Sequence, residues 1–433
     1  MGGADDRRIL KVMRRVTDWW LTLWFEPSSP TNLGVSRALF FAGVLTVHFN
    51  ENYSDWGNVS DAFWLPMPLF TALHLKAFSP LVLSLLQTAW RLALVMSALG
   101  LFSRISMTAT LVLSAYLFGL PHNFGQTYHF DALLVIATGI LACSRAGDAW
   151  SIDALMKGRN PPEPSGEYTW PIRMVWVAMA LVFFAAGLAK LRYGGLEWVT
   201  SDNMTMLLRR AAYHVSDADP IGTAGLWIAD RPWLSRGLAA ASLAIELGFV
   251  FAVFSRTARV LMVPAAFLML IGIRVLMGPT FGGFLVANVF WVNWDALGER
   301  LSVWIRPTQR VTVVFDDGCG LCRNVIEAVR RLDLLDAVTV LDVTSEWSSI
   351  AVRFPALTHA ACLADMHVIG ANGSVTAGFA GYRELAKVLP LGWFLLPVLY
   401  LPGVPAIGRR IYRLVADRRG RSQRVVPPIR PSA

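Results

Sequence analysis

The sequence predicts a mainly α-helical, polytopic membrane bundle of about eight transmembrane helices, followed by a smaller C-terminal α/β domain. Of the 433 residues, 55% are hydrophobic and only 16% are charged, whereas soluble domains carry about 25% charged residues. The mean hydropathy is +0.48. These values exclude an ordinary soluble enzyme and a disordered chain. Charged residues become more frequent after about residue 306, and this change predicts a water-exposed domain of about 128 residues at the C-terminus.

The first segment, residues 1–30, is expected to be an amphipathic helix that lies in the headgroup layer of a membrane. Apolar residues recur at helical spacing between basic ones, as in Ile9, Met13 and Val16, with Trp19 and Trp20 close behind. This pattern is typical of interfacial helices. The apolar stretch is interrupted, and no small-residue cleavage site follows it, so we expect the segment to be retained.

The region from residue 31 to residue 305 contains the candidate membrane spans. Each one approaches the ~20 residues that a bilayer requires. The eight expected spans are 34–50, 79–99, 105–121, 129–144, 171–191, 237–254, 258–278 and 281–297.

The basic residues between these spans predict the orientation. With a cytoplasmic N-terminus, the loops on the same side carry Arg104, Arg145, Lys157, Arg159, Arg256, Arg259, Arg300 and Arg306. The opposite loops are acidic, mixed or uncharged. The positive-inside rule therefore predicts a plasma-membrane protein with both termini in the cytoplasm.

Four ionisable residues lie inside the expected spans or close to their ends: Arg91, Lys190, Glu246 and Arg274. Such residues are costly in hydrocarbon and usually face a partner or a cavity. Glu246 and Arg274 lie on neighbouring spans and can form a buried ion pair that sets helix register. Lys190 lies at a span end, where it can also extend to the membrane interface.

The expected topology brings Lys190 and His129 to one side of the membrane. The fourth span begins at His129 on the non-cytoplasmic side, and the fifth span ends there at Lys190. A lysine in a partly apolar pocket can act as a base, and a neutral imidazole can orient a small substrate. The alternative reading of His129 is an interfacial residue whose hydrogen bonds are satisfied.

The run Phe183-Phe184-Ala185-Ala186-Gly187-Leu188-Ala189-Lys190-Leu191, followed by Trp198, resembles the HTTM family, which includes vitamin K-dependent gamma-glutamyl carboxylase. The resemblance implies that Lys190 is the base that deprotonates vitamin K hydroquinone and that His129, in Thr127-Tyr128-His129, is its partner. Further similar features are Gly100-Leu101-Phe102-Ser103-Arg104, Trp150-Ser151-Ile152-Asp153-Ala154-Leu155 and Ile245-Glu246-Leu247.

The carboxylase has a large lumenal portion that grips a propeptide, whereas the membrane part of this chain ends near Pro307 without such a region. We therefore do not expect protein carboxylation. A vitamin K-like quinone, or another lipid-soluble molecule, is the candidate substrate of the membrane part, and no cofactor is certain.

The C-terminal part contains a redox motif. A β-branched run over 311–315 leads into Asp-Asp-Gly-Cys-Gly-Leu-Cys, and apolar residues at helical spacing follow over 324–332. This order places Cys319 at the N-terminus of a helix, where free backbone N–H groups stabilise a thiolate. Cys322, one turn later, can resolve a mixed disulfide. The motif predicts a thioredoxin-like domain with Cys319 and Cys322 as catalytic residues.

Further elements of this domain are expected as a strand over 338–343, a hairpin with an Asn-Gly turn over 366–377, and a helix over 382–389. A zinc site is the alternative reading of the cysteine pair, with His359 and Cys362 as the other ligands. The strand-to-helix setting favours redox chemistry, so we predict no metal.

The pattern Asp317-Gly318-Cys319-Gly320-Leu321-Cys322 resembles the DCC family of thiol-disulfide oxidoreductases, and the resemblance extends over about 310–420. One residue that usually separates the glycine from the first cysteine is missing. The proline that faces the cysteines in thioredoxins is also missing before Met366. The resemblance implies disulfide reduction, with an altered recognition of the substrate.

The expected domains are 1–30, the amphipathic segment; 31–305, the HTTM-like bundle; 308–420, the DCC-type domain; and 421–433, a basic tail. The expected function is thiol-disulfide oxidoreduction. The alternatives are a vitamin K- or quinone-dependent enzyme, carboxylase-like or epoxidase-like, that uses Lys190 and His129, and a non-catalytic bundle that holds the redox domain at the bilayer. The expected partners are membrane lipids, which suit the basic tail, and a disulfide-containing protein or small molecule. No aromatic-basic motif indicates nucleic acid.

Overall fold

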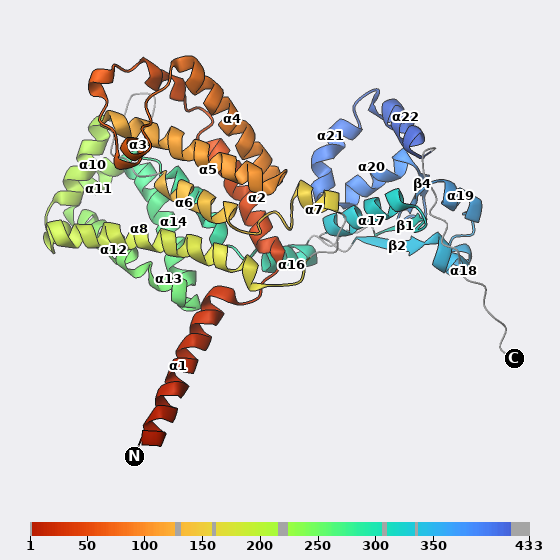
Figure 1. Cartoon of the computed structure of the whole chain (residues 1–433), viewed down its shortest axis with the longest axis horizontal. Coiled ribbons are helices and arrows are strands. Elements are labelled where there is room, and N and C mark those ends of the chain that lie inside the picture. Colours follow the sequence, from red (N-terminus) through yellow and green to blue (C-terminus); the bar gives the residue numbers. More distant parts are fainter. Residues whose placement is uncertain are drawn as a thin grey trace. The chain divides into compact units, whose positions relative to one another are not determined.

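A computed structural model describes residues 2–125, 131–157, 162–214, 224–304, 310–333 and 337–416 (Figure 1). The chain forms two compact units. The first comprises Met1–Ala154 and Pro162–Trp294, and the second comprises Leu155–Pro161 and Asp295–Ala433.

The first unit is helical. Its longer helices are α1 (Gly2–Phe25), α2 (Pro30–Val47), α4 (Pro80–Leu99), α5 (Ser103–Gly119), α6 (Ala132–Ala142), α8 (Trp170–Gly194), α10 (Asn203–His214), α12 (Pro232–Gly248) and α14 (Arg256–Met277). Its shorter helices are α3 (Pro68–Ala72), α7 (Ile152–Lys157, whose last residues belong to the second unit), α9 (Glu197–Thr200), α11 (Ala224–Ala229), α13 (Phe251–Phe254) and α15 (Gly282–Ala287). The 3-10 turns are Tyr53–Asn58, Asp61–Phe63, Leu120–Phe124, Gly166–Tyr168 and Asn288–Trp291.

Four helical segments of the described chain are long and apolar enough to cross a membrane: Pro80–Leu99, Ser103–Phe124, Gly166–Gly194 and Arg256–Met277. They correspond to four of the eight expected spans. Two other expected spans are shorter apolar helices, Ala132–Ala142 and Gly282–Trp291. The structure therefore supports a membrane bundle with four full-length spans, and eight spans stay a prediction.

The bundle packs around a continuous apolar core. Trp90 of α4 and Phe40 and Phe41 of α2 are fully buried in it. Hydrogen bonds between helices pair some of the buried polar groups: the Trp90 indole N–H donates to Ser114 Oγ at 2.8 Å. Asp153 accepts hydrogen bonds from the backbone N–H groups of Phe102 and Ser103, at 2.9 and 2.7 Å. It thus satisfies the free donors at the start of α5.

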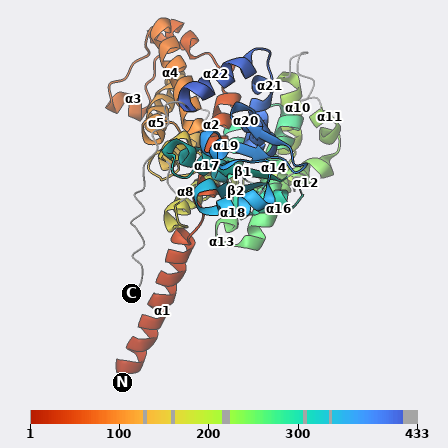
Figure 2. The same cartoon turned by 90° about the vertical axis from the view of Figure 1, so that its right-hand side faces the viewer.

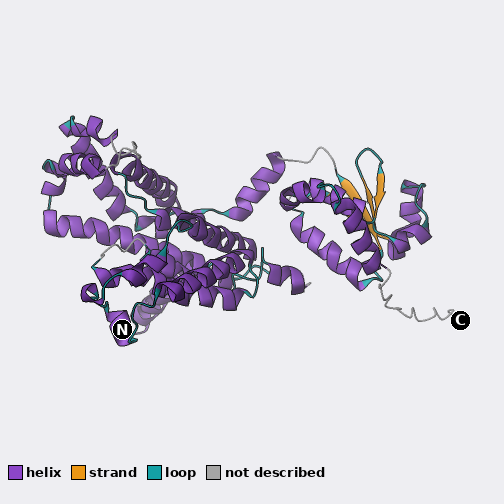
Figure 3. Cartoon of the chain, turned by 90° about the horizontal axis from the view of Figure 1, so that it is seen from above, coloured by secondary structure: helices purple, strands orange, loops and turns teal. Residues whose placement is uncertain are grey.

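The second unit contains the four described strands, which appear in orange in Figure 3. They are β1 (Val311–Phe315), β2 (Val338–Asp342), β3 (His367–Ile369) and β4 (Val375–Ala377). The helices are α16 (Trp294–Trp304, whose first residue belongs to the first unit), α17 (Gly320–Leu332), α18 (Val343–Arg353), α19 (His359–Ala364), α20 (Phe379–Val388), α21 (Leu396–Leu399) and α22 (Val404–Ala416), with a 3-10 turn at Pro390–Leu395.

The strand order in the sheet is β2-β1-β3-β4. β1 pairs with β2 in parallel through the α17 crossover, and β1 pairs antiparallel with β3. β3 and β4 form the expected hairpin, whose turn uses Gly373 at φ 78°. Glycine tolerates this left-handed conformation because it has no Cβ. The expected hairpin and both expected strands are therefore present, and the central strand β1 is the one that carries the cysteine motif at its end.

Helices cover both faces of the sheet (Figure 2). Val313 faces a core shared with Ile326 of α17 and Leu385 of α20. Val314, the next residue, faces a second core with Ile350 of α18 and Cys362 of α19. Successive strand residues point to opposite faces, so every residue of β1 is buried. This explains why four of the five residues of the strand are apolar.

Candidate functional site

The redox motif lies at the junction of β1 and α17. Cys319 is the N-cap residue of α17, in an extended conformation with φ −94° and ψ 111°. Its Sγ accepts a hydrogen bond from the backbone N–H of Cys322, at 3.4 Å. The structure therefore brings both predicted cysteines to the first turn of the helix, and the N-terminal sulfur lies where the helix dipole favours negative charge.

Hydrogen bonds hold the turn that precedes Cys319. The Asp316 carboxylate accepts from the N–H of Gly318 at 2.9 Å. Arg323 Nη2 donates to the Asp317 carbonyl at 2.7 Å, and Arg323 Nε lies 3.3 Å from the Asp317 carboxylate. These contacts hold the guanidinium of Arg323, in the first turn of α17, against the turn that precedes Cys319.

Both cysteines are outside any disulfide and both are buried, with Cys319 3% and Cys322 8% exposed. They belong to the core that α17 and α20 form over the sheet, together with Phe315 and Met366. A substrate disulfide can therefore reach Cys319 only when neighbouring side chains move aside.

Met366 lies directly before β3. Its N–H lies 3.4 Å from the hydroxyl of Tyr412 on α22, within donor distance. The ring of Tyr412 also packs edge-on against Tyr382 of α20, with centroids 6.0 Å apart. Helix α22 thus contacts the segment that adjoins the cysteines. The sequence analysis did not predict this contact.

Asp342 is a further polar residue beside the motif that the sequence analysis missed. Its carboxylate accepts from the N–H of Asp317 at 3.1 Å and caps α18 through Thr344 and Ser345. Partial burial favours the neutral acid, but these hydrogen bonds prevail and lower the pKa of Asp342. Glu346 Oε2 in turn accepts from the N–H of Asp342 at 3.0 Å. An aspartate that ends a strand directly before a helical segment is an N-cap signal in the sequence.

The zinc alternative is not supported by the structure. Cys362 lies in the core on the other face of the sheet from Cys319 and Cys322. The His359 ring instead packs edge-on against Trp347, with centroids 4.9 Å apart. Within the described ranges, no group of three or more metal-binding side chains occurs. Burial raises the pKa of the Cys362 thiol, as expected for an unreactive cysteine.

In the first unit, Lys190 of α8 forms an ion pair with Glu246 of α12. The carboxylate side chain is 8% exposed and the lysine side chain 23%. Lys190 Nζ also lies 5.0 Å from the ring centre of Trp198, a cation–π contact. The structure therefore differs from the expected Glu246–Arg274 pair, because Glu246 pairs with Lys190 while Arg274 donates to the carbonyl of Gly278 at 2.9 Å.

His129 lies outside the described residues, so its predicted proximity to Lys190 stays a prediction. A different histidine, His48 at the end of α2, is buried with 6% exposure. Its Nε2 lies 3.5 Å from the Asp131 carboxylate, and its ring packs against Phe118. The sequence analysis did not single out His48, because an isolated histidine at the end of an apolar run gives no signal of a partner 83 residues away.

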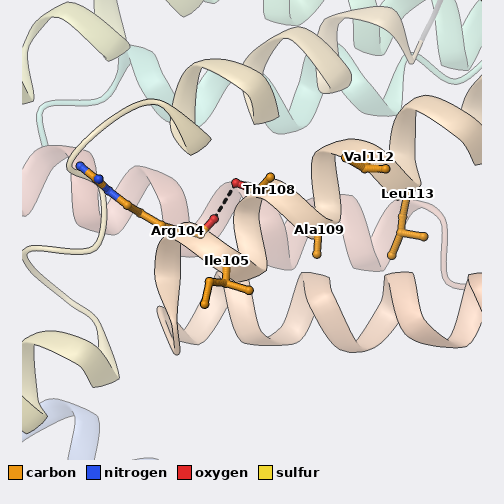
Figure 4. Close-up of a pocket in the computed structure, with 6 residues that line it drawn as sticks. All are labelled: Arg104, Ile105, Thr108, Ala109, Val112 and Leu113. Atoms are coloured by element: carbon orange, nitrogen blue, oxygen red, sulfur yellow. Dashed lines mark hydrogen bonds between the residues drawn. The ribbon is translucent and has the colours of Figure 1, made fainter.

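A hollow of about 610 Å³ lies along α5 (Figure 4). It is lined by Arg104, Ile105, Thr108, Ala109, Val112 and Leu113. All six residues come from one helix, and Thr108 Oγ1 is occupied by a hydrogen bond to the Arg104 carbonyl at 2.7 Å. This surface is an apolar helix face and brings together no reactive groups.

Fold and site together define the class: a membrane-embedded helical bundle joined to a small α/β unit that presents a Cys-x-x-Cys pair at a helix N-terminus. The model of the HTTM domain matches residues 25–277. The chain therefore belongs to the HTTM family. The model of the DCC1-like thiol-disulfide oxidoreductase family matches residues 313–425. The two matches confirm the expected fusion of the two families. No curated protein and no solved structure is significantly similar to the chain.

Proposed function

We propose that this membrane protein is a thiol-disulfide oxidoreductase in which Cys319 attacks and Cys322 resolves. The observation that carries the proposal is the position of Cys319 as N-cap of α17, with Cys322 one turn away on the same helix. A helix N-terminus stabilises the thiolate, which is the nucleophile in disulfide exchange. The match to the DCC1-like family over the same residues supports this assignment.

In the proposed reaction, the Cys319 thiolate attacks one sulfur of a substrate disulfide and forms a mixed disulfide. The other substrate sulfur leaves as a thiolate and takes up a proton. The Cys322 thiolate then attacks Cys319 Sγ, which forms the Cys319–Cys322 disulfide and releases the second substrate thiol. A dithiol donor returns two electrons to the pair. The substrate is a disulfide-containing protein or small molecule.

The test is disulfide reduction by the full-length protein in detergent, with dithiothreitol as the electron donor. We expect turnover of a model disulfide above the uncatalysed rate, and loss of that turnover in Cys319→Ser. The matched control is Cys362→Ser, since Cys362 is also a buried thiol but lies on the other face of the sheet. Activity that survives Cys319→Ser would refute the proposal.

The second unit is proposed to lie in the cytoplasm, with both termini on that side of the plasma membrane. The basic loop residues support this orientation through the positive-inside rule. Cytoplasmic thiol buffers keep exposed dithiols reduced, so the direction that we propose is reduction.

A second candidate function is a quinone-linked reaction in the bundle. The observation in its favour is the ion pair of Lys190 and Glu246 inside a helical membrane unit. Glu246 Oε2 is buried without a hydrogen-bond partner, so it can accept from a phenolic hydroxyl. Lys190 can donate to a quinone oxygen and can hold or release a proton. These residues therefore fit a bound hydroquinone, which would supply electrons and protons, and His129 is the proposed partner.

The test of this second function is reconstitution with a reduced quinone, followed by assays of quinone epoxidation and CO2 fixation. Turnover that is lost in Lys190→Ala would support it. Turnover that is indifferent to Lys190→Ala would reject it. No turnover at all would leave the bundle as a non-catalytic scaffold that holds the redox unit at the bilayer.

A further inference from the structure

The last described segment of the second unit carries an unusual amount of exposed apolar surface. Outside residues 393–414, the described part of residues 310–416 exposes two large apolar side chains, Val352 and Val375. Within that segment, the exposed side chains include Leu395, Val398 and Leu401 around α21 and Ile407, Ile411 and Leu414 on α22. Exposed apolar side chains gathered in one region indicate a binding surface.

The apolar residues of α22 form a stripe that the core of the unit does not use. Ile407, Ile411 and Leu414 recur at spacings of four and three residues and are 59%, 57% and 60% exposed, so they share one side of the helix. A different side packs on α20, where Gly408 meets Phe379 and Tyr412 meets Tyr382. The stripe is therefore available to another surface.

All charged side chains of this segment are basic. Arg409, Arg410 and Arg413 are exposed on α22, and the sequence between residues 389 and 416 contains no aspartate or glutamate. A helix with an exposed apolar stripe and basic residues beside it is the pattern of an interfacial helix on anionic lipid.

We propose that the α21–α22 surface, residues 393–414, docks the second unit onto anionic phospholipid. The chain belongs to the HTTM family, and the described part of its first unit has four helices that are long and apolar enough to cross a membrane, so the second unit is tethered to a membrane unit. A second copy of this chain fits less well, because a two-fold dimer through this surface would place like-charged arginines together without any acidic partner. This inference goes beyond the proposed redox reaction and does not depend on it.

The test is hydrogen–deuterium exchange on the full-length protein, one copy per nanodisc. One set of discs contains phosphatidylcholine alone, and the other contains phosphatidylcholine mixed with phosphatidylglycerol. Each basic residue near an anionic surface strengthens binding about fivefold. We therefore expect the backbone amides of residues 404–416 to exchange at least fivefold more slowly in the anionic discs.

The triple variant Arg409→Gln/Arg410→Gln/Arg413→Gln should lose this lipid-dependent protection. The charge-matched control Arg310→Gln/Arg330→Gln/Arg353→Gln alters exposed arginines elsewhere in the unit and should keep it. Equal exchange in both kinds of disc would overturn the proposal. Protection that appears in detergent and grows with protein concentration would assign the surface to a second copy and would overturn it as well.

Discussion

At the scale of single residues, Lys190 and Glu246 show how the bundle accommodates charge. An unpaired charge inside a membrane is costly, so ionisable residues in spans face a partner or a cavity. Glu246 is the more buried of the two, with 8% of its side chain exposed, and Lys190 retains 23% exposure and a contact with Trp198. The cost of breaking the pair should therefore depend on which residue is removed.

Lys190→Met should destabilise the protein more than Glu246→Gln, because it leaves a buried carboxylate without its cation. The double variant should lose less stability than the two single variants together, with a coupling free energy of about 1–3 kcal/mol. Thermal unfolding in detergent measures all three. Lys76→Met removes an exposed lysine of the same unit and serves as the control. Strict additivity would show that the pair contributes nothing.

The sequence predicted the placement of the cysteine pair better than the ion pairs of the bundle. Cys319 and Cys322 were identified because strand, turn and helix follow one another directly in the chain. Glu246 was assigned to Arg274, whereas its partner is Lys190, 56 residues away. Contacts between distant helices depend on how the helices rotate and pack, and local periodicity does not contain that information.

At the scale of elements, the cap of α18 is linked to the redox turn through Asp342. This carboxylate accepts hydrogen bonds from the backbone N–H groups of Thr344 and Ser345 and also from that of Asp317, which lies two residues before Cys319. The start of α18 and the turn before Cys319 therefore share one ionised group. Loss of its charge should loosen both.

Asp342→Ala should destabilise the second unit by about 1 kcal/mol, the usual contribution of an N-cap side chain. The rate at which dithiodipyridine modifies buried Cys362 in the full-length protein measures the opening of the unit. We expect a rise of about fivefold, which corresponds to that free energy. Asp342→Asn, which keeps capping ability, should show a smaller rise. An unchanged rate in Asp342→Ala would contradict this role.

The same cap predicts a pH dependence. The pKa of Asp342 is lowered in the folded state, so its ionised form stabilises the fold above the unfolded pKa, which is about 3.9. This contribution is lost as the pH falls through the lower, folded pKa. The difference in Cys362 modification between the native chain and Asp342→Asn should therefore shrink below about pH 4. A constant difference across this range would exclude the carboxylate as its cause.

The strands of the second unit and helices α17 and α20 were predictable because each has a local signal. The β-branched run predicted β1 with the bounds that the structure shows, and the Asn-Gly turn predicted the hairpin of β3 and β4.

The membrane spans were less predictable. Helix α6 has 11 residues and so extends only about 16 Å, well short of a ~30 Å hydrocarbon core. A run of apolar residues indicates burial but does not specify where the helix begins and ends.

At the scale of the whole molecule, the orientation in the membrane decides the redox environment of the cysteine pair. Cys143, at the C-terminal end of α6, is the exposed cysteine of the chain, whereas Cys319, Cys322 and Cys362 are buried. It is therefore the best native reporter of sidedness. The proposed topology places Cys143 on the cytoplasmic side.

In intact cells, an impermeant maleimide should leave Cys143 unlabelled until the membrane is permeabilised. Asn58→Cys introduces an exposed thiol into the segment between α2 and α4, which the same topology places outside. This variant should label without permeabilisation. Mass spectrometry of the labelled peptides identifies the label at both sites. Labelling of Cys143 in intact cells would contradict the proposed orientation.

The central claim is that Cys319 forms a mixed disulfide that Cys322 resolves, and trapping that intermediate tests it most directly. The full-length Cys322→Ser variant is incubated with a disulfide-bonded peptide and analysed by mass spectrometry. We predict a stable adduct of one peptide half at Cys319, which dithiothreitol releases. The native chain should pass through the adduct to a Cys319–Cys322 disulfide. An adduct at Cys362 or Cys143 with none at Cys319 would contradict the account.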